Sequence, residues 1–229
     1  MKSLLSYFTK IEKILWCSSV FLILASFMTF DRENYLSLVA SLIGVTSLIF
    51  CAKGNPIGLV LMVLFSIIYG IISYSFAYYG EMITYLGMSG PMAFFALIAW
   101  LKNPYKGKKS QVKVNRISNK EIVFMLVLSI LVTVLFYFIL RYFETANLIP
   151  STLSITTSFI AVYLTFRRSP YFALVYAIND LVLIVLWTLA TLTDINYISV
   201  LICFVVFFIN DIYGFISWLK MEKIQKNNM

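Results

Sequence analysis

Residues 122–140 read IVFMLVLSILVTVLFYFIL, nineteen consecutive positions without one charged side chain. A helix that crosses a bilayer needs roughly 20 mostly apolar residues, and this run with its flanks at 121–143 is long enough. Because lipid offers no hydrogen-bond partner to open backbone groups, a membrane segment must be a helix or part of a closed barrel. The run is continuous rather than alternating, so it predicts a transmembrane helix.

The rest of the chain repeats this pattern. Of 229 residues, 61% are hydrophobic and 12% are charged, whereas soluble domains are about half apolar and about a quarter charged. The first apolar run follows three lysines, but no small-residue cleavage site follows it, so we expect a retained helix rather than a signal peptide. We predict an all-α integral membrane protein with about eight transmembrane helices, at about 14–30, 35–52, 57–78, 82–101, 121–143, 150–166, 171–193 and 196–219.

Basic residues gather on one side of this arrangement. Membrane proteins keep Lys and Arg in their cytoplasmic loops, so both termini are predicted to be cytoplasmic. The net charge of +8 then follows from topology and not from a nucleic-acid-binding surface. The Lys-rich loop at 103–120 is expected to be a solvated linker, with lipid or partner binding as the alternative. The cytoplasmic side collects sixteen basic residues, namely Lys2, Lys10, Lys13, Lys53, Lys102, Lys106, Lys108, Lys109, Lys113, Arg116, Lys120, Arg167, Arg168, Lys220, Lys223 and Lys226, against Arg32 and Arg141 opposite.

Two stretches of the chain resemble each other. LSLVASLIGV at 36–45 aligns with LSITTSFIAV at 153–162, and the sequence Trp-Leu-Lys closes each stretch at 100–102 and 218–220. Each stretch holds three predicted helices, with one helix between them, so both triplets run the same way across the bilayer. This is a parallel 3+1+3 arrangement, as in SWEET-type carriers, where substrate binds near the midplane between repeats. Chance similarity between apolar helices is the alternative.

The repeat divides the chain into six parts. These are an N-terminal helix at 1–34, a first three-helix repeat at 35–102, the basic loop at 103–120, a linker helix at 121–149, a second repeat at 150–220 and a cytoplasmic tail at 221–229.

Polar side chains within a spanning helix are costly, and they mark functional sites by default. Asp180 and Asp211 each follow an Asn in the middle of one of the last two helices. On these two helices, the polar and aromatic residues that lie three, four or seven positions apart share one face of their helix. The alternative is that these Asp and Asn residues join helices to each other, with Asp211 as the structural member. The predicted substrate-binding residues are Tyr176, Asn179, Asp180, Trp187, Asn210 and Trp218, with Ser66 and Tyr69 from the helix at 57–78.

Catalytic and cofactor chemistry is not expected. The chain contains no His, and its three cysteines, Cys17, Cys51 and Cys203, lack metal-ligand spacing. Gly-rich phosphate loops and the HExxH and GxSxG motifs are also absent. We therefore predict that the protein is not an enzyme, binds no cofactor or metal and is not driven by ATP, and that the thiols pack in the helices.

The chain resembles the PnuC family of nicotinamide riboside transporters. The resemblance covers roughly residues 35–220 and rests on NPIGLVLMVLFSIIYG at 55–70, YYGEM at 78–82, Asn179-Asp180 and the Trp that closes each half. It implies a SWEET-like fold, a homotrimer, and facilitated diffusion followed by trapping through a cytoplasmic kinase. Members that carry nicotinamide riboside tend to have two Trp where this chain has Ala173 and Tyr176. Carriage of thiamine, riboflavin or a deoxynucleoside, as in relatives of the family, therefore stays open.

The resulting hypothesis is a facilitator for a vitamin-related nucleoside, nicotinamide riboside first. Its positively charged ring suits stacking and cation–π contact with Tyr176, Trp187 and Trp218. Amide and hydroxyl groups would bind the ribose, and Asp180 would balance the charge. A cation moving inward gains about 2.3 kcal/mol per 100 mV, although proton coupling through an intramembrane Asp is also open. A receptor subunit or a membrane enzyme is the alternative from another class.

Overall fold

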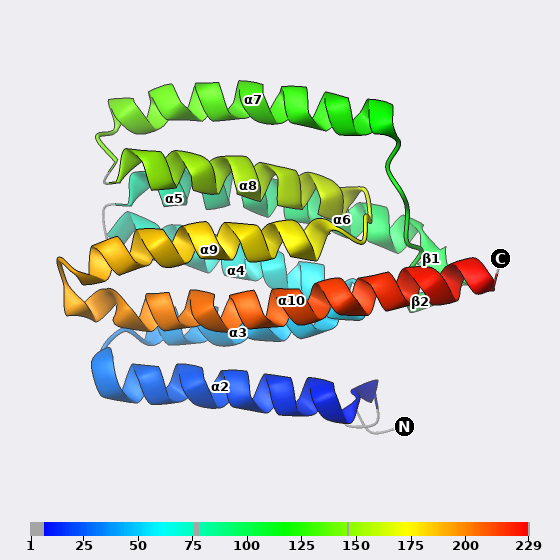
Figure 1. Cartoon of the computed structure of the whole chain (residues 1–229). Helices are drawn as coiled ribbons and strands as arrows, with labels where there is room; N and C mark the ends of the chain where they lie inside the picture. The colour runs from blue at the N-terminus through cyan, green and yellow to red at the C-terminus, as the bar shows by residue number, and fades with distance from the viewer. Residues whose placement is uncertain (1–6, 76–77, 146, 229) are drawn as a thin grey trace.

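The computed structural model describes residues 7–75, 78–145 and 147–228. Within them, eight helical segments are long and apolar enough to cross a membrane, which confirms the all-α prediction. Figure 1 shows these segments packed side by side in one bundle. The elements are α2 (Lys10–Phe30), α3 (Tyr35–Ala52), α4 (Ile57–Ser75), α5 (Tyr79–Thr84), the π-helix η1 (Tyr85–Ser89), α6 (Gly90–Lys102), β1 (Pro104–Tyr105), β2 (Lys108–Val112), α7 (Asn119–Tyr142), α8 (Leu148–Phe166), α9 (Phe172–Thr191), the 3-10 helix η2 (Ile195–Tyr197) and α10 (Ile198–Asn227).

Several helices begin where the sequence supplies a cap. A capping box starts α2, because Thr9 Oγ1 accepts from the Glu12 backbone N–H at 3.2 Å and Glu12 Oε2 accepts from the Thr9 N–H at 2.7 Å. The side chains of Asn34 and Ser118 accept from the backbone three residues onward, at the starts of α3 and α7. These caps satisfy N–H groups that would otherwise be open at a membrane surface.

The fourth span is not one continuous helix. The sequence predicts an unbroken helix at 82–101, whereas the structure has α5, a π-helical turn and then α6. Pro91 has no N–H to offer the carbonyl four residues earlier, at Gly87, and its ring crowds the preceding turn. A π-helical turn is a common accommodation of such a break and occurs often at functional sites.

The basic loop and the tail are more ordered than predicted. Residues 104–112 form an antiparallel β-hairpin that pairs Pro104 with Val112, and Gly107 takes a left-handed conformation at its tip with φ of 73°. α10 continues to Asn227, so most of the predicted tail at 221–229 is helical. Gln225 of that extension binds the hairpin strand, donating to the carbonyl of Val112 at 3.0 Å. This contact with the hairpin stabilises the end of α10 outside the membrane.

Six of the spans form a closed ring. α3 packs against α4, α4 against α6, α6 against α8, α8 against α9, α9 against α10, and α10 against α3. α2 covers α3 and α10 from outside, and α7 packs on α8, so these two helices lie at opposite edges in Figure 1. The centre of the ring is therefore the place where buried polar groups from both triplets meet.

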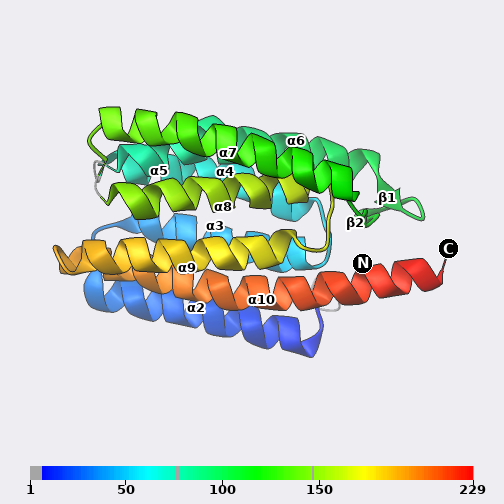
Figure 2. The same cartoon turned by 45° about the horizontal axis from the view of Figure 1, so that its top comes forward.

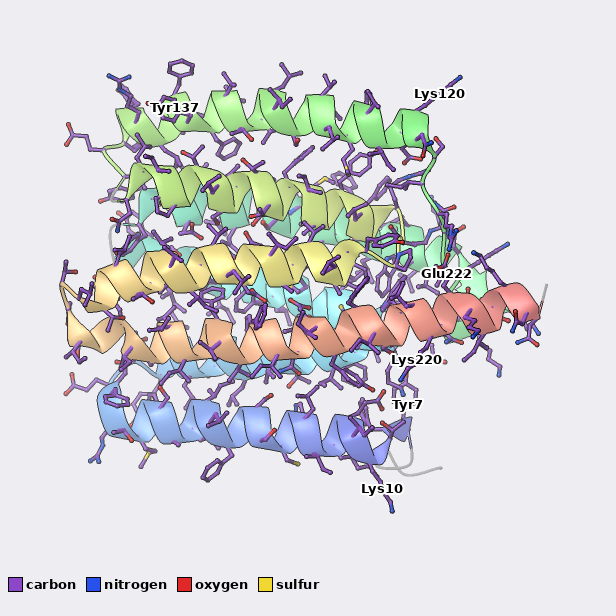
Figure 3. All side chains as sticks on the ribbon, viewed as in Figure 1. Tyr7, Lys10, Lys120, Tyr137, Lys220 and Glu222 are labelled. Atoms are coloured by element: carbon purple, nitrogen blue, oxygen red, sulfur yellow. The ribbon has the colours of Figure 1, made fainter. Side chains whose placement is uncertain are left out.

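Both termini and the hairpin lie at the same end of the bundle (Figures 1 and 2). Lys10, Lys120 and Lys220 mark this end on three different helices (Figure 3). The ion pairs among the described residues are also there, between Glu12 and Lys53, Glu121 and Arg167, and Glu222 with both Arg116 and Lys226. Of the predicted basic residues of this side, Lys2 lies outside the described residues. We call this end the basic end and the other the outer end.

Candidate functional site

A cavity lies inside the ring, beside the middle of α9 and α10. It has about 40 Å³ of free volume, and since one buried water needs roughly 10–15 Å³ on this scale, about three waters would fill it. Sites for small organic ligands usually enclose roughly 300–1,000 Å³. The structure is therefore a contracted state, which must widen to admit a ligand. The lining comprises Gly44, Leu48, Met62, Phe65, Ser66, Tyr85, Ser89, Ser158, Tyr176, Asn179, Asp180, Phe204, Phe207 and Asp211.

Two carboxyl groups meet at this cavity. Asp180 of α9 and Asp211 of α10 are 4% and 5% exposed, and both line the cavity. Asp180 Oδ2 has no hydrogen-bond partner within the described part of the chain. Both residues are brought together because α9 and α10 form an antiparallel pair, each with its Asp near the middle. The site thus contains an acid pair with one oxygen free for a ligand.

Asn179 connects the acid pair to α8. Its Oδ1 accepts from Thr157 Oγ1 at 2.7 Å and from Ser158 Oγ at 3.1 Å. These bonds fix the amide beside Asp180 and orient its acceptor toward α8. Tyr176, one turn earlier on α9, also lines the cavity. The predicted face of α9 is therefore the one that borders the cavity.

Aromatic rings from both halves form the opposite wall. Phe65 of α4 meets Phe207 of α10 with ring centroids 5.6 Å apart, and Tyr85 of η1 lies 5.9 Å from Phe65. Ser66, the residue after Phe65, is 1% exposed and lines the cavity, and its Oγ has no partner among the described residues. Rings around a carboxyl pair and a free hydroxyl are suited to a flat ligand that is partly polar and positively charged.

Two predicted substrate-binding residues, Trp187 and Tyr69, lie further toward the outer end. Trp187 is fully buried and contacts Tyr78 and Tyr197, with ring centroids 5.0 and 5.6 Å away. Tyr69 stacks on Phe65 and contacts Tyr85 at a tilt, with ring centroids 4.4 Å apart, one layer behind the cavity wall. Burial raises the pKa of Tyr78, and the neighbouring Tyr197 and Glu81 add to this effect, so its phenol stays neutral. Trp187 shares a helix face with Asp180 but stands two turns away, about 10 Å along the axis.

Trp218 lies toward the basic end. Its indole Nε1 donates to the carbonyl of Cys51 at 2.8 Å, at the end of α3. Trp100, which closes the first half, makes the equivalent bond to the carbonyl of Thr165 near the end of α8, at 2.9 Å. The two indoles also touch, with ring centroids 5.3 Å apart. Each half of the chain thus closes on the other half through a buried Trp, and neither ring lines the cavity.

Asn210 faces away from the cavity, contrary to expectation. Its Nδ2 donates to Ser19 Oγ of α2 at 2.9 Å and to the carbonyl of Val206 at 2.8 Å. Neighbouring positions on an α-helix point about 100° apart. Asp211 therefore faces the ring interior while Asn210 faces α2, where it joins helices as the alternative interpretation had it.

Glu81 is a buried acid that the sequence places just outside a helix. In the structure it lies within α5 and is fully buried, and Ser154 Oγ donates to its Oε1 at 3.3 Å. Its other oxygen has no partner among the described residues. The predicted start of this helix, at 82, was three residues too late, which left Glu81 outside.

Sequence reasoning missed most of the cavity wall. Phe65, Phe204, Phe207 and Tyr85 were not distinguished from the other aromatic residues of an apolar chain. The sequence offered one signal. Phe65 is adjacent to Ser66, so its ring lies beside a residue that was predicted to bind substrate.

The chain matches, over residues 34–220, the family described as nicotinamide mononucleotide transporter. It belongs to this family. The nicotinamide riboside transporter PnuC of Neisseria mucosa is 25% identical over 199 residues, which cover 85% of this chain and 75% of that protein. The crystal structure described as the vitamin B3 transporter PnuC matches with a TM-score of 0.83 at 21% identity, over 95% of this chain and 94% of that one.

The family match and the similarity to PnuC establish the class to which this protein belongs. The family and its relatives are transporters and not enzymes, as predicted, and this chain is a multi-pass membrane protein of that class. The structural match confirms the fold. α2 precedes the matched region at 34–220, and it packs on the outside of the ring that contains the site.

Proposed function

We propose that this PnuC family member carries nicotinamide riboside across the bacterial inner membrane by facilitated diffusion. The observation that carries this proposal is the buried Asp180–Asp211 pair, which lines the same cavity as Tyr176, Phe65 and Phe207. A pyridinium ring is flat, aromatic and positively charged. Aromatic faces attract such a cation, and a carboxylate in a low-dielectric site balances its charge.

The cavity favours a nucleoside over its phosphorylated form. No Lys or Arg is among the residues that line it, and the ion pairs of the described residues are at the basic end. A phosphate monoester carries about −1.5 to −2 charge at neutral pH. Beside two buried carboxyl groups, that charge would be repelled and would lose its hydration without a compensating cation. We therefore assign the unphosphorylated nucleoside as the substrate.

The acid pair also ranks the alternative substrates by their charge. Thiamine is a cation and satisfies the acid pair, whereas riboflavin and deoxyuridine are uncharged and do not use it. Within the site, Tyr176 and the Phe wall would stack on the ring, Asn179 and Ser66 would hydrogen-bond the ribose or carboxamide, and Asp180 would balance the charge. Trp187, Trp218, Tyr69 and Asn210, one layer or more away, would act by supporting these residues.

Alternating access would come from rocking of the two triplets, α3–α4–α6 and α8–α9–α10, about the cavity. A parallel repeat is supported by matched interactions at the ends of α3 and α8. Gly54 and Arg168 both take left-handed conformations, with φ of 66° and 58°. The next residues, Asn55 and Ser169, donate backbone N–H groups five positions back, at 3.0 and 2.9 Å. Trp218 and Trp100 then bind the carbonyls of these same two helix ends.

Trp218→Phe should loosen the closure at the basic end. The change keeps an aromatic ring but removes the indole N–H, so the Cys51 carbonyl loses this 2.8 Å bond and keeps the one from the Gly54 N–H. A buried hydrogen bond contributes about 0.5–1.5 kcal/mol and the smaller ring adds a loss of packing, so the open population should rise by about tenfold. The thiol of Cys51, which is buried, should then react faster with a maleimide, as read by mass spectrometry.

Trp16→Phe is the matched control for this experiment. The Trp16 indole donates to Thr46 Oγ1 at an exposed site on α2, at 3.2 Å. The same chemical change there should leave Cys51 labelling unchanged. Equal labelling of Cys51 in wild type and Trp218→Phe would contradict a role for this bond in closure.

The proposal also covers the orientation of the protein in the membrane, the trapping of the substrate after entry and the oligomeric state. The basic end would face the cytoplasm, because cytoplasmic loops are rich in Lys and Arg, so both termini would lie inside. Phosphorylation of the substrate by a cytoplasmic kinase would trap it, since the charged product no longer suits the cavity. A homotrimer rests on the family resemblance, and α7 offers the most exposed apolar helix for such contacts or for lipid.

Purified protein in liposomes should take up labelled nicotinamide riboside with saturation. Unlabelled nicotinamide riboside should compete, and the mononucleotide should compete at least about a hundredfold less well, because a repelled buried charge costs roughly 3 kcal/mol or more. Thiamine, riboflavin and deoxyuridine are the comparison competitors. If one of them competes better than nicotinamide riboside, the substrate assignment is wrong while the transporter assignment stands.

A further inference from the structure

We propose that a groove at the basic end binds a phosphate monoester carried on a flat ring, as in a mononucleotide, and that this ligand holds the transporter closed. The groove is separate from the cavity inside the ring, since no described residue lines both. Its ligand class follows from its own residues. Its effect on transport rests on the proposed function, because trapping by phosphorylation would produce such a molecule at this end.

The groove is large enough for a small ligand, and four parts of the chain form it. It has about 420 Å³ of free volume, within the roughly 300–1,000 Å³ of small-molecule sites. Its walls come from the chain around the start of α2, the end of α3, the hairpin and the extension of α10. Tyr7 and Lys220, from the first and last of these walls, both lie at the basic end in Figure 3. The hairpin and the helix extension, which the sequence did not predict, therefore build this groove.

The groove carries an excess of positive charge. Lys53, Lys108 and Lys220 line it, against the carboxylate of Glu12. Glu12 is already bound, because Lys53 Nζ lies 3.1 Å from both of its oxygens and the Tyr213 hydroxyl donates to it at 3.1 Å. Lys108 and Lys220 are exposed and form no ion pair with a described residue. Two ammonium groups are therefore available to an anion, and Lys is a common binder of phosphate.

Two tyrosines, Tyr7 and Tyr105, give the groove flat aromatic faces. The Tyr7 hydroxyl accepts from Asn55 Nδ2 at 3.0 Å, and Lys53 Nζ lies over its ring, 4.8 Å from the centroid. The Tyr105 hydroxyl is buried and has no partner among the described residues. Buried polar groups normally have a partner, so a residue of the lining still has hydrogen-bonding capacity for a polar ligand. Nucleotide bases stack on such rings without regard to their sequence identity.

The groove spans two helix ends that would separate if the basic end opened. Lys53 is the C-cap residue of α3 in the first triplet, and Lys220 belongs to α10 in the second. Ser217 of α10 also lines the groove, and its hydroxyl donates to the carbonyl of Ala52 at 2.8 Å. An anion bound among the lysines would add contacts that exist only while these ends are together. A ligand shifts an equilibrium toward the state that it binds better, so occupancy should keep the basic end closed.

Such a ligand would act as a brake on uptake. Under the proposed function, a cytoplasmic kinase converts the carried nucleoside into a mononucleotide on the side of the basic end. The acid pair of the cavity repels this product, whereas the lysines of the groove attract it. Uptake would therefore slow as the product accumulates. The brake would act from the basic end alone, whereas a competitor for the cavity acts from either side.

Thermal unfolding of the purified protein tests the groove without transport. Nicotinamide mononucleotide should raise the Tm of the wild type, and the effect should weaken as salt is added. The double variant Lys108→Gln/Lys220→Gln should bind it about tenfold less tightly. Loss of binding in Asp180→Asn but not in this lysine variant would place the ligand in the cavity and overturn the inference.

Lys109→Gln/Lys223→Gln is the matched control. It removes two exposed lysines from the same strand and the same helix, and neither of them lines the groove. Adjacent residues of a strand point to opposite faces, so Lys109 is the closest available counterpart of Lys108. The control should bind the mononucleotide as the wild type does. If both double variants bind equally weakly, the effect is one of net charge and the groove is not the site.

Two further measurements identify the source of the phosphate. Tyr105→Leu should weaken binding of the mononucleotide about tenfold and leave binding of inorganic phosphate unchanged, because only the former has a ring to stack. Phosphatidylglycerol added to the detergent should not reproduce the rise in Tm. If it does so through Lys108 and Lys220 while the mononucleotide does not, the occupant is a lipid headgroup and the mononucleotide assignment is wrong. If neither raises the Tm, the groove binds no phosphate and the inference is wrong.

Vesicles loaded with the mononucleotide test the brake. For protein whose basic end faces the lumen, uptake of labelled nicotinamide riboside should fall several-fold relative to vesicles loaded with chloride at the same ionic strength. Uptake by Lys108→Gln/Lys220→Gln should be equal in both. Wild-type uptake that the loaded mononucleotide does not reduce would overturn the brake and leave the proposed function intact. Absence of uptake in either kind of vesicle would count against the proposed function, and the Tm measurements would still decide whether the groove binds its ligand.

Discussion

Asp180→Ala is expected to reduce uptake of nicotinamide riboside by at least about a hundredfold. The change removes a carboxyl group that lines the cavity and whose Oδ2 has no partner among the described residues, and it leaves Asp211 as the remaining acid of the pair. Breaking a buried polar pair costs about 3–5 kcal/mol, which corresponds to two or more orders of magnitude in binding. Initial uptake rates in liposomes at fixed protein density measure the effect.

Two further variants separate charge from folding. Asp180→Asn keeps the side-chain volume and a polar group beside Asp211, so it should fold like wild type and transport the cation poorly, with residual uptake through Asp211. Glu33→Ala removes an exposed acid near the outer end and should leave uptake unchanged. If Asp180→Asn lowers transport of the cation and of the uncharged dihydro form equally, Asp180 acts through packing and not through charge.

The membrane fold could be predicted from this sequence because it depends on length and composition. A charge-free run such as 122–140 has one stable solution in lipid, and caps such as Thr9 and Asn34 set where helices begin. The exceptions are local. The π-helical turn at 85–89 and the hairpin at 104–112 leave no clear periodic signal, since both lie where Pro, Gly and short polar stretches interrupt the pattern.

The sequence predicted the polar and charged residues of the candidate site but not the aromatic residues that form its wall. Tyr176, Asn179, Asp180 and Ser66 line the cavity as expected, because a polar group in a spanning helix is rare enough to be informative. Trp187 and Trp218 were grouped with them by helix face, yet each stands two turns from its Asp, one toward each end. Which of 20 Phe residues reach the cavity depends on how α4 and α10 pack, and a single sequence does not encode that pairing visibly.

Buried Trp residues close the cavity toward both ends of the bundle, so their packing affects transport. Trp100 and Trp218 seal the ring toward the basic end, whereas Trp187, Tyr78 and Tyr197 pack together toward the outer end. The site between them has room for only about three waters. Widening it therefore requires the triplets to separate at one end, so packing at the helix crossings limits which states the protein reaches. Gly58 lies at one of these crossings, between α3 and α4.

Gly58→Ala is expected to destabilise the protein strongly. A Cβ at this position would lie 2.6 Å from the backbone N of Cys51 and 2.8 Å from the carbonyl oxygen of Ser47, so α3 and α4 could keep their present distance only with glycine here. The same approach lets Ser47 Oγ donate to the carbonyl of Gly58 at 2.7 Å. Backbone atoms cannot rotate away, and overpacking of this kind costs about 1–3 kcal/mol or more. Thermal unfolding in detergent, followed by size-exclusion fluorescence, should show a lower Tm and a smaller folded fraction.

Gly87→Ala supplies the comparison for Gly58. Gly87 is exposed within η1, and a Cβ there would meet only Ile83 Cγ2, at 3.9 Å, which is an ordinary contact. The same methyl group should therefore leave the Tm close to that of wild type. A Cβ at Gly58 would also lie 2.5 Å from the Sγ of Cys51, the residue whose carbonyl accepts from Trp218. Gly58→Ala should therefore also weaken closure at the basic end. If both alanine variants unfold at the wild-type temperature, the α3–α4 crossing is looser than these distances imply.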